Sequence, residues 1–109
     1  MNWLDVCSVS DLQENAGICV LVNGEQVAIF YVKNTVYAIS NFDPFGEANV
    51  LSRGIIGDYR GEIVVASPLH KEHFNLKTGE CLEHSEVKIP AYACRIDNGF
   101  VQIPAESLL

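Results

Sequence analysis

The fold is decided by residues 67–80, which read Ser67-Pro68-Leu69-His70-Lys71-Glu72-His73-Phe74-Asn75-Leu76-Lys77-Thr78-Gly79-Glu80. A proline-containing loop at 67–71 is followed by a short apolar run and then by a second turn at 77–79. Upstream, Asn41-Phe42-Asp43-Pro44-Phe45 interrupts the strand-like pattern in the same way. Proline and glycine at such positions favour turns between strands, so we expect two loops that protrude from a β-sheet protein.

These two loops resemble the ligand loops of Rieske iron–sulfur domains. A Rieske [2Fe–2S] cluster is held by two cysteines on one iron and two histidines on the other. Here Asp43 and Ser67 occupy the cysteine positions, Phe45 occupies one histidine position, and His70 keeps the other. One imidazole cannot hold a diiron cluster. The sequence therefore predicts a Rieske-like fold that has lost the cluster, with no cofactor in this chain.

Further segments extend the pattern over essentially the whole chain: 3–7 (Trp-Leu-Asp-Val-Cys), 27–30 (Val-Ala-Ile-Phe), 38–45, 50–54 (Val-Leu-Ser-Arg-Gly), 66–69, 74–76 and 79–82. Together they resemble the small subunit of assimilatory NAD(P)H-dependent nitrite reductase, a Rieske-like family that lacks the cluster ligands. In that family a large subunit carries the flavin, siroheme and iron–sulfur centres that reduce nitrite to ammonia. The resemblance implies a role in nitrate assimilation, with the large catalytic subunit as partner. It also implies that this chain alone is non-catalytic.

The loop tips are the predicted surface for that partner. Apolar residues on exposed loops, ringed by polar ones, suggest a docking surface. An alternative is that Phe45 folds inward and fills the volume of the missing cluster, and both arrangements hold if Pro68 and Leu69 stay outside. The candidate docking residues, which include the degenerate ligand positions, are Asp43, Pro44, Phe45, Ser67, Pro68, Leu69 and His70.

Two rival functions use the same region. His70, His73, Cys81 and His84 are a set that suits zinc, which gives the alternative of a stand-alone metal-binding β-protein. Asp43, Ser67 and His70 are also the three residue types of a hydrolytic triad, although Ser67 lacks the Gly-x-Ser-x-Gly turn. The chain has no Gly-x-Gly-x-x-Gly for a nucleotide and no Cys-x-x-Cys pair. For these reasons we predict no catalytic, cofactor-binding or metal-binding residues.

The overall charge narrows the class of partner. Seven Lys and Arg against 14 Asp and Glu give a formal charge of −7, which repels nucleic acid and anionic membranes. The longest apolar run, 27–32, is far shorter than the roughly 20 residues of a membrane helix. Residues 1–5 have no basic flank or long apolar segment of a signal peptide. We expect a cytoplasmic protein with free thiols.

The pattern of short apolar runs and turn residues predicts an all-β domain. We expect a single domain over 1–109, built as a Rieske-like antiparallel sandwich of two to three small sheets. Asn23-Gly24 predicts a tight hairpin, and a helical turn starts near Ser10. Arg53 is expected to pair with Asp43 or Glu47. The predicted strands span 3–9, 17–22, 25–32, 35–40, 54–56, 62–66, 73–76, 80–82, 92–96 and 100–103.

Several other residues have structural roles in this interpretation. Asp43 is expected to cap its loop by accepting backbone N–H groups. Trp3 and Phe100 are predicted to lie in the core, and Cys19 and Cys94 to act as small buried hydrophobes. His73 is expected to lie on a strand, either facing solvent or half-buried beside Phe74, and His84 is expected in an exposed loop.

Overall fold

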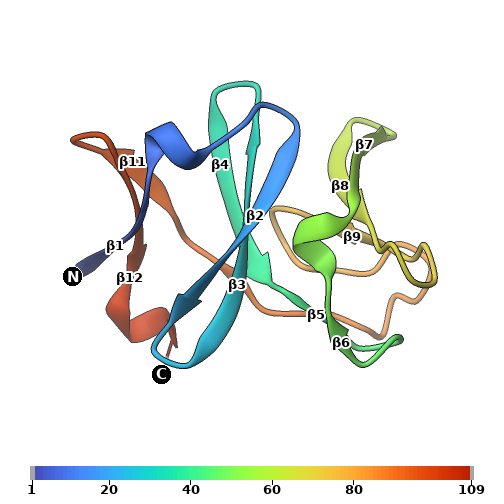
Figure 1. Ribbon diagram of the computed structural model, residues 1–109. Coiled ribbons are helices and arrows are strands. Elements are labelled where there is room, and N and C mark those ends of the chain that lie inside the picture. Colours follow the sequence, from blue (N-terminus) through green and yellow to red (C-terminus); the bar gives the residue numbers. More distant parts are fainter. Residues whose placement is uncertain (1, 109) are drawn as a thin grey trace.

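The computed structural model describes residues 2–108, and most of the regular structure in this part of the chain is β-strand (Figure 1). The strands are β1 (Trp3–Ser8), β2 (Ala16–Val22), β3 (Glu25–Val32), β4 (Thr35–Ser40), β5 (Phe42–Asp43), β6 (Ala48–Asn49), β7 (Ile55–Tyr59), β8 (Glu62–Ala66), β9 (His73–Asn75), β10 (Ala91–Tyr92), β11 (Arg95–Asp97) and β12 (Phe100–Pro104). Three short 3-10 turns are η1 (Val9–Asp11), η2 (Leu51–Arg53) and η3 (Ala105–Leu108). The all-β prediction is confirmed. Over residues 2–108 the antiparallel sheets number four, because β5 and β6 form a small ladder of their own.

The meander of β2, β3 and β4 is held by two tight turns. Asn23 and Gly24 have φ values of 51° and 83°, and the next turn has 51° at Lys33 and 63° at Asn34. Paired positive φ values belong to type I′ turns, whose twist matches that of the flanking strands. The predicted bounds of β3 and β4 are the observed ones.

The register of β3 and β4 is the one set by the two-residue turn between them. Ile29 lies opposite Ala38, and Tyr31 lies opposite Val36. Strand β10 adds to the free side of β4, so the sheet order is β10-β4-β3-β2. In Figure 1 this sheet lies between β1, β11 and β12 on the left and β7, β8 and β9 on the right.

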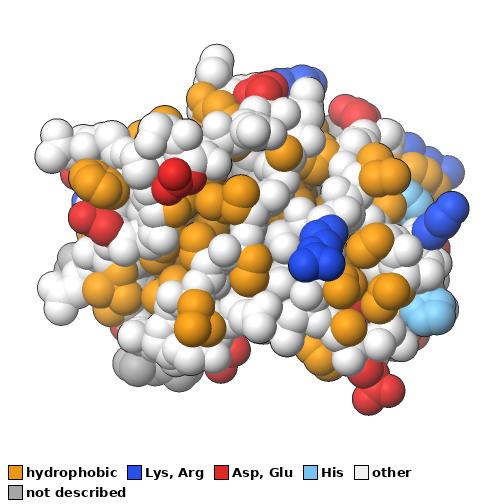
Figure 2. All heavy atoms as spheres, viewed as in Figure 1, with side chains coloured by type: hydrophobic (Ala, Val, Ile, Leu, Met, Phe, Trp, Pro, Cys, Tyr) orange, Lys and Arg blue, Asp and Glu red, His pale blue; other side chains and the backbone are white. Residues whose placement is uncertain are grey.

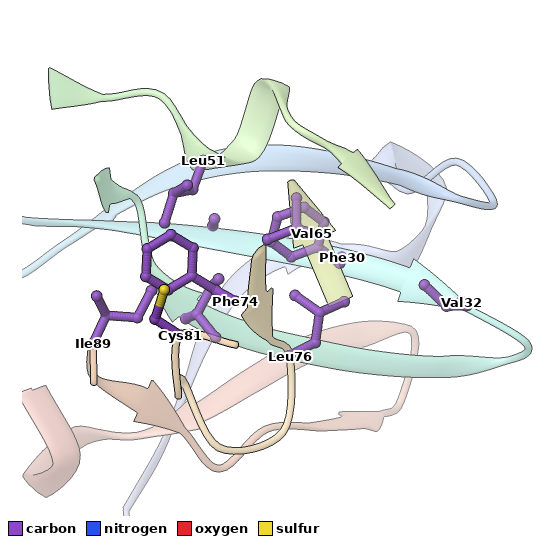
Figure 3. Close-up of a cluster of buried hydrophobic side chains, with 10 residues drawn as sticks. Phe30, Val32, Leu51, Val65, Phe74, Leu76, Cys81 and Ile89 are labelled. Atoms are coloured by element: carbon purple, nitrogen blue, oxygen red, sulfur yellow. The ribbon is translucent and has the colours of Figure 1, made fainter. Parts of the chain in front are cut away.

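Strand β3 is buried on both faces, which explains the unbroken apolar run at 27–32. Successive side chains of a strand point to opposite faces of its sheet. Ala28, Phe30 and Val32 join one buried cluster, whereas Val27 and Ile29 join the other. Figure 3 shows the first cluster, in which Phe30 and Val32 lie with Leu51, Val65, Phe74, Leu76, Cys81 and Ile89.

The terminal strands close the second cluster. In the sheet β1-β12-β11, Val101 and Ile103 of β12 are fully buried. Phe100 was predicted to lie in the core, but its side chain is 41% exposed because it sits on the outer face of the same strand. Trp3 is half-buried, and the Arg95 guanidinium lies 4.1 Å from the centre of its ring.

Four predictions from the sequence were wrong in the detail of strands or burial. The β7–β8 turn is Arg60-Gly61, two residues rather than five, so β7 runs to Tyr59. Residues 80–82 form single bridges instead of a strand, with Cys81 opposite Phe74. Residues 92–96 are split, since β10 pairs with β4 and β11 pairs with β12. Cys19 is exposed, not buried, on the edge strand β2.

The surface is unevenly charged. On the face shown in Figure 2, most of the visible Lys and Arg side chains lie over the right-hand half, which holds β7–β9 in the view of Figure 1. Acidic side chains are spread over both halves. Among the described residues, no helix has the length and hydrophobicity needed to cross a membrane.

Candidate functional site: the paired loops

The first loop joins β5 to β6 and is organised by Asp43. This side chain is fully buried, and its Oδ1 accepts the backbone N–H groups of Phe45 (2.9 Å) and Gly46 (3.2 Å). The capping role predicted for Asp43 is confirmed. An aspartate that accepts N–H groups two and three residues ahead closes a turn without help from the sheet.

The second loop leaves β8 at Ser67 and closes on itself. The N–H of Ser67 donates to the carbonyl of Glu72 (2.9 Å), and the N–H of Lys71 donates to the carbonyl of Ser67 (3.0 Å). Within the loop, the N–H of Leu69 donates to Ser67 Oγ (3.2 Å). Ser67 is 1% exposed, so its hydroxyl organises the base of the loop from a buried position.

The two loops meet through these buried side chains. Ser67 Oγ donates a hydrogen bond to Asp43 Oδ2. Beside this contact, Gly46 packs so closely on Leu69 that a Cβ at position 46 would overlap the leucine side chain. The two positions that hold one iron in a Rieske cluster therefore lie next to each other and are joined directly.

Phe45 points inward while the tip of the second loop points outward. The Phe45 ring is half-buried, with its centroid 6.3 Å from that of Phe74 and 4.9 Å from that of His84. Leu69 is 48% exposed, and Pro68 and His70 beside it are also exposed. Both expected arrangements hold at once, with Phe45 inside and the Pro68-Leu69 tip outside.

The comparisons with known proteins agree with this geometry. Residues 2–104 match a family described as the Rieske-like [2Fe-2S] domain. The nitrite reductase (NADH) small subunit of Salmonella typhimurium strain LT2 is 47% identical over 103 residues, which cover 93% of this chain and 95% of the relative. This chain belongs to the Rieske-like family of nitrite reductase small subunits. Its relatives are subunits of an oxidoreductase.

Two other similarities bear on the Rieske-like domain. The solved structure of the Escherichia coli protein NirD has a TM-score of 0.86 and 44% sequence identity, and the match covers 94% of each chain. The nitrite reductase [NAD(P)H] large subunit of Klebsiella oxytoca is 36% identical over 107 residues, covering 98% of this chain but 11% of the relative. The predicted Rieske-like architecture is confirmed, and a similar domain also occurs inside a large subunit.

The family description implies a [2Fe–2S] cluster, but the residues of this Rieske-like domain do not fit one. Iron–sulfur clusters are held by strongly donating thiolates and imidazoles. The Asp43 carboxylate and the Ser67 hydroxyl are hydrogen-bonded to each other, and the Phe45 ring has no atom that can bind iron. Of the four ligand positions, His70 alone carries a suitable ligand.

The metal-binding alternative is not supported by the geometry of the Rieske-like domain. His73 Nδ1 lies 2.6 Å from Glu83 Oε2, whereas His84 stacks on Phe45. Burial, opposed in part by backbone hydrogen bonds, raises the pKa of the Cys81 thiol, which disfavours the thiolate that a metal requires. Over residues 2–108, no three His, Cys, Asp or Glu side chains form a group that could hold a metal ion.

The hydrolase interpretation also fails on geometry. A nucleophilic serine must donate its proton to the histidine. Here Ser67 Oγ donates to Asp43 and is buried, while His70 is exposed at the loop tip. The three residues are near one another in the fold but do not form a triad.

The sequence missed two residues that shape the site. Asn41 is 2% exposed, and its Oδ1 accepts the N–H of Ser52 (2.7 Å), which ties the first loop to η2. The predicted pairing of Arg53 with Asp43 or Glu47 is wrong. Arg53 is exposed and forms no ion pair in the described part of the chain. His84 was expected only to be exposed, but it also covers Phe45. An asparagine directly after an apolar strand was the one available signal for Asn41.

Proposed function

We propose that this chain is the small, cofactor-free subunit of an NAD(P)H-dependent nitrite reductase and that it binds the large catalytic subunit. The observation that carries this proposal is the Klebsiella oxytoca large subunit, in which a similar domain belongs to the same polypeptide. A domain that is a separate chain has no covalent link to the large subunit and must bind it through a non-covalent interface. The 47% identity to a separate small subunit supports this assignment.

The chemistry of the loops supports a non-catalytic role. Nitrite reduction to ammonia needs redox centres, and the paired loops hold a hydrogen bond where an electron carrier would sit. The resemblance implies flavin, siroheme and iron–sulfur centres for the reaction, and we propose that they lie on the large subunit. The proposal includes a cytoplasmic location and a role in nitrate assimilation, and the charge of −7 disfavours nucleic acid and anionic membranes.

We assign partner binding to the tip surface, defined as Pro44, Phe45, Pro68, Leu69 and His70. Leu69 is the exposed large hydrophobic side chain of this surface, at 48% exposure, whereas Phe45 packs against the buried cluster below the loops. An apolar patch ringed by polar groups is the common composition of a docking site. The close packing of Gly46 on Leu69 fixes the patch from below.

Leu69→Asp should weaken binding to the large subunit by more than about 1 kcal/mol, or about fivefold in Kd, because it places a charge in a desolvated contact. The measurement is calorimetric titration of the purified large subunit. The control is Leu21→Asp, the same change at a leucine that is 72% exposed on β2, and it should leave Kd unchanged.

Equal affinities for both variants would remove Leu69 from the interface. Another result would contradict the proposed function itself. In it, the large subunit alone reduces nitrite at the full rate, is fully stable, and does not retain the wild-type chain in a pull-down.

The purified chain should contain iron and zinc only in substoichiometric amounts. Three of the four cluster-ligand positions are unsuitable for iron, and over residues 2–108 no three His, Cys, Asp or Glu side chains form a group that could hold zinc. Elemental analysis and a visible spectrum check this. A brown sample that gives a paramagnetic signal on reduction would show a cluster and contradict the proposal. Stoichiometric zinc would instead revive the metal-binding alternative based on His70, His73, Cys81 and His84.

A further inference from the structure

We propose that the Asp43–Ser67 hydrogen bond replaces the iron–sulfur cluster as the link between the two loops, and that it positions the tip surface. Asp43 and Ser67 are called the interloop pair below. In this role they are positioning residues, since they act on the tip through the backbone. The link itself is independent of the proposed function, and only its effect on docking rests on that function.

The first step of the argument is position. In a Rieske cluster both cysteines bind the same iron, so the metal ties one loop to the other. Asp43 and Ser67 stand at those two positions, 24 residues apart in sequence, and are hydrogen-bonded to each other. A direct link has taken the place of a metal-mediated one at the same point of the fold.

The second step is burial. Asp43 is 0% exposed and Ser67 is 1% exposed, so water does not compete for this hydrogen bond. Buried polar groups are costly unless they are satisfied, and hydrogen bonds to carboxylates are stronger than those between neutral groups. Asp43 receives three donors, namely the Ser67 hydroxyl and the N–H groups of Phe45 and Gly46.

The third step is that the backbone donors belong to both loops and include residues of the tip surface. The N–H groups of Phe45 and Gly46 bind Asp43, and the N–H of Leu69 binds Ser67 Oγ. The backbone of both loops is thus fixed by one connected network, whose central member is the interloop pair. Neither Asp43 nor Ser67 belongs to the two apolar clusters, so the network can be broken while the core stays packed.

The test is Ser67→Ala, followed by amide hydrogen exchange of the whole chain. We expect exchange at Phe45 and Gly46, in the other loop, to rise by about tenfold, while amides of β3 exchange as in the wild type at equal global stability. A purely local role of Ser67 would accelerate only Leu69, which loses its own acceptor. Unchanged exchange at Phe45 and Gly46 would therefore overturn the proposal.

The matched control is Ser8→Ala. Ser8 Oγ also accepts a backbone N–H, from Ser10 (3.2 Å), but at an exposed helical turn far along the chain from both loops. Exchange at Phe45 and Gly46 should not change in this variant. If Ser67→Ala does not fold, Ser67→Cys is measured instead, because a thiol is a weaker donor of similar size, and the same cross-loop acceleration is expected.

Binding to the large subunit gives the second readout. Ser67→Ala should weaken it by about fivefold, although position 67 is buried and cannot touch a partner. Cross-loop acceleration with unchanged affinity would overturn the positioning of the tip surface. A wild-type chain that binds no large subunit would overturn the proposed function, and the exchange result would still decide whether the interloop pair links the loops.

Discussion

Phe74→Ala should lower the free energy of unfolding by about 3–5 kcal/mol, which is the usual cost of removing a fully buried aromatic ring. Phe74 is 0% exposed and lies at the centre of the cluster in Figure 3, between β8 and the segment that bears Cys81. It also supports Phe45 beneath the tip surface. For a chain of this size, a loss of that magnitude is a large share of the total stability. Urea denaturation followed by circular dichroism measures it.

The control is Phe100→Ala in β12. This phenylalanine is 41% exposed, so the same change removes fewer contacts and should cost less than about 1 kcal/mol. A similar loss for both variants would mean that burial in the cluster of Figure 3 does not explain the effect of Phe74.

The meander could be predicted from the sequence because its signals are local. Asn23-Gly24 fixes a two-residue turn, and the register of a tight hairpin then follows from the turn itself. The apolar run at 27–32 identified β3 and its bounds. Its burial on both faces needed the structure, since such a run does not say which elements cover it.

Strand pairings between distant segments could not be predicted in the same way. Residues 92–96 were predicted to form one strand because no turn residue separates their two halves. The structure divides them between β4 and β12, which lie in different sheets. Glu80 and Cys81 form only single bridges because they pair with different segments, Glu80 with Lys88 and Cys81 with Phe74. Such choices depend on tertiary packing more than on local propensity.

The candidate site shows the same division. The cap at Asp43 was predictable, because an aspartate can close its own loop. The link from Asp43 to Ser67 was not, since it joins residues that meet only when β4 and β8 place the two loops side by side. The Phe45–His84 contact is another case, because His84 reaches the site from the segment after Cys81. The resemblance to Rieske domains identified positions 43, 45, 67 and 70 in the sequence. The contacts between their side chains could be seen only in the structure.

Gly79→Ala should lower the free energy of unfolding by about 2–5 kcal/mol, because two separate effects add. Gly79 has a φ of 80°, a conformation that alanine adopts at a cost. In addition, a Cβ at this position would overlap the backbone carbonyl of Ile89. The Ile89 backbone is held in place, because its N–H donates a hydrogen bond to the carbonyl of Gly79 (2.9 Å). Backbone atoms cannot move aside as a flexible side chain can. Thermal unfolding followed by circular dichroism measures the loss.

Gly99→Ala separates the two effects. Gly99 has nearly the same φ, 84°, but a Cβ there would meet nothing within 4 Å. It should therefore show only the conformational cost, about 1–2 kcal/mol. The difference between the two variants is the cost of the close approach between the turn at 77–79 and the segment around Ile89. Equal losses would mean that this segment yields freely, and that Gly79 is required only for its backbone conformation.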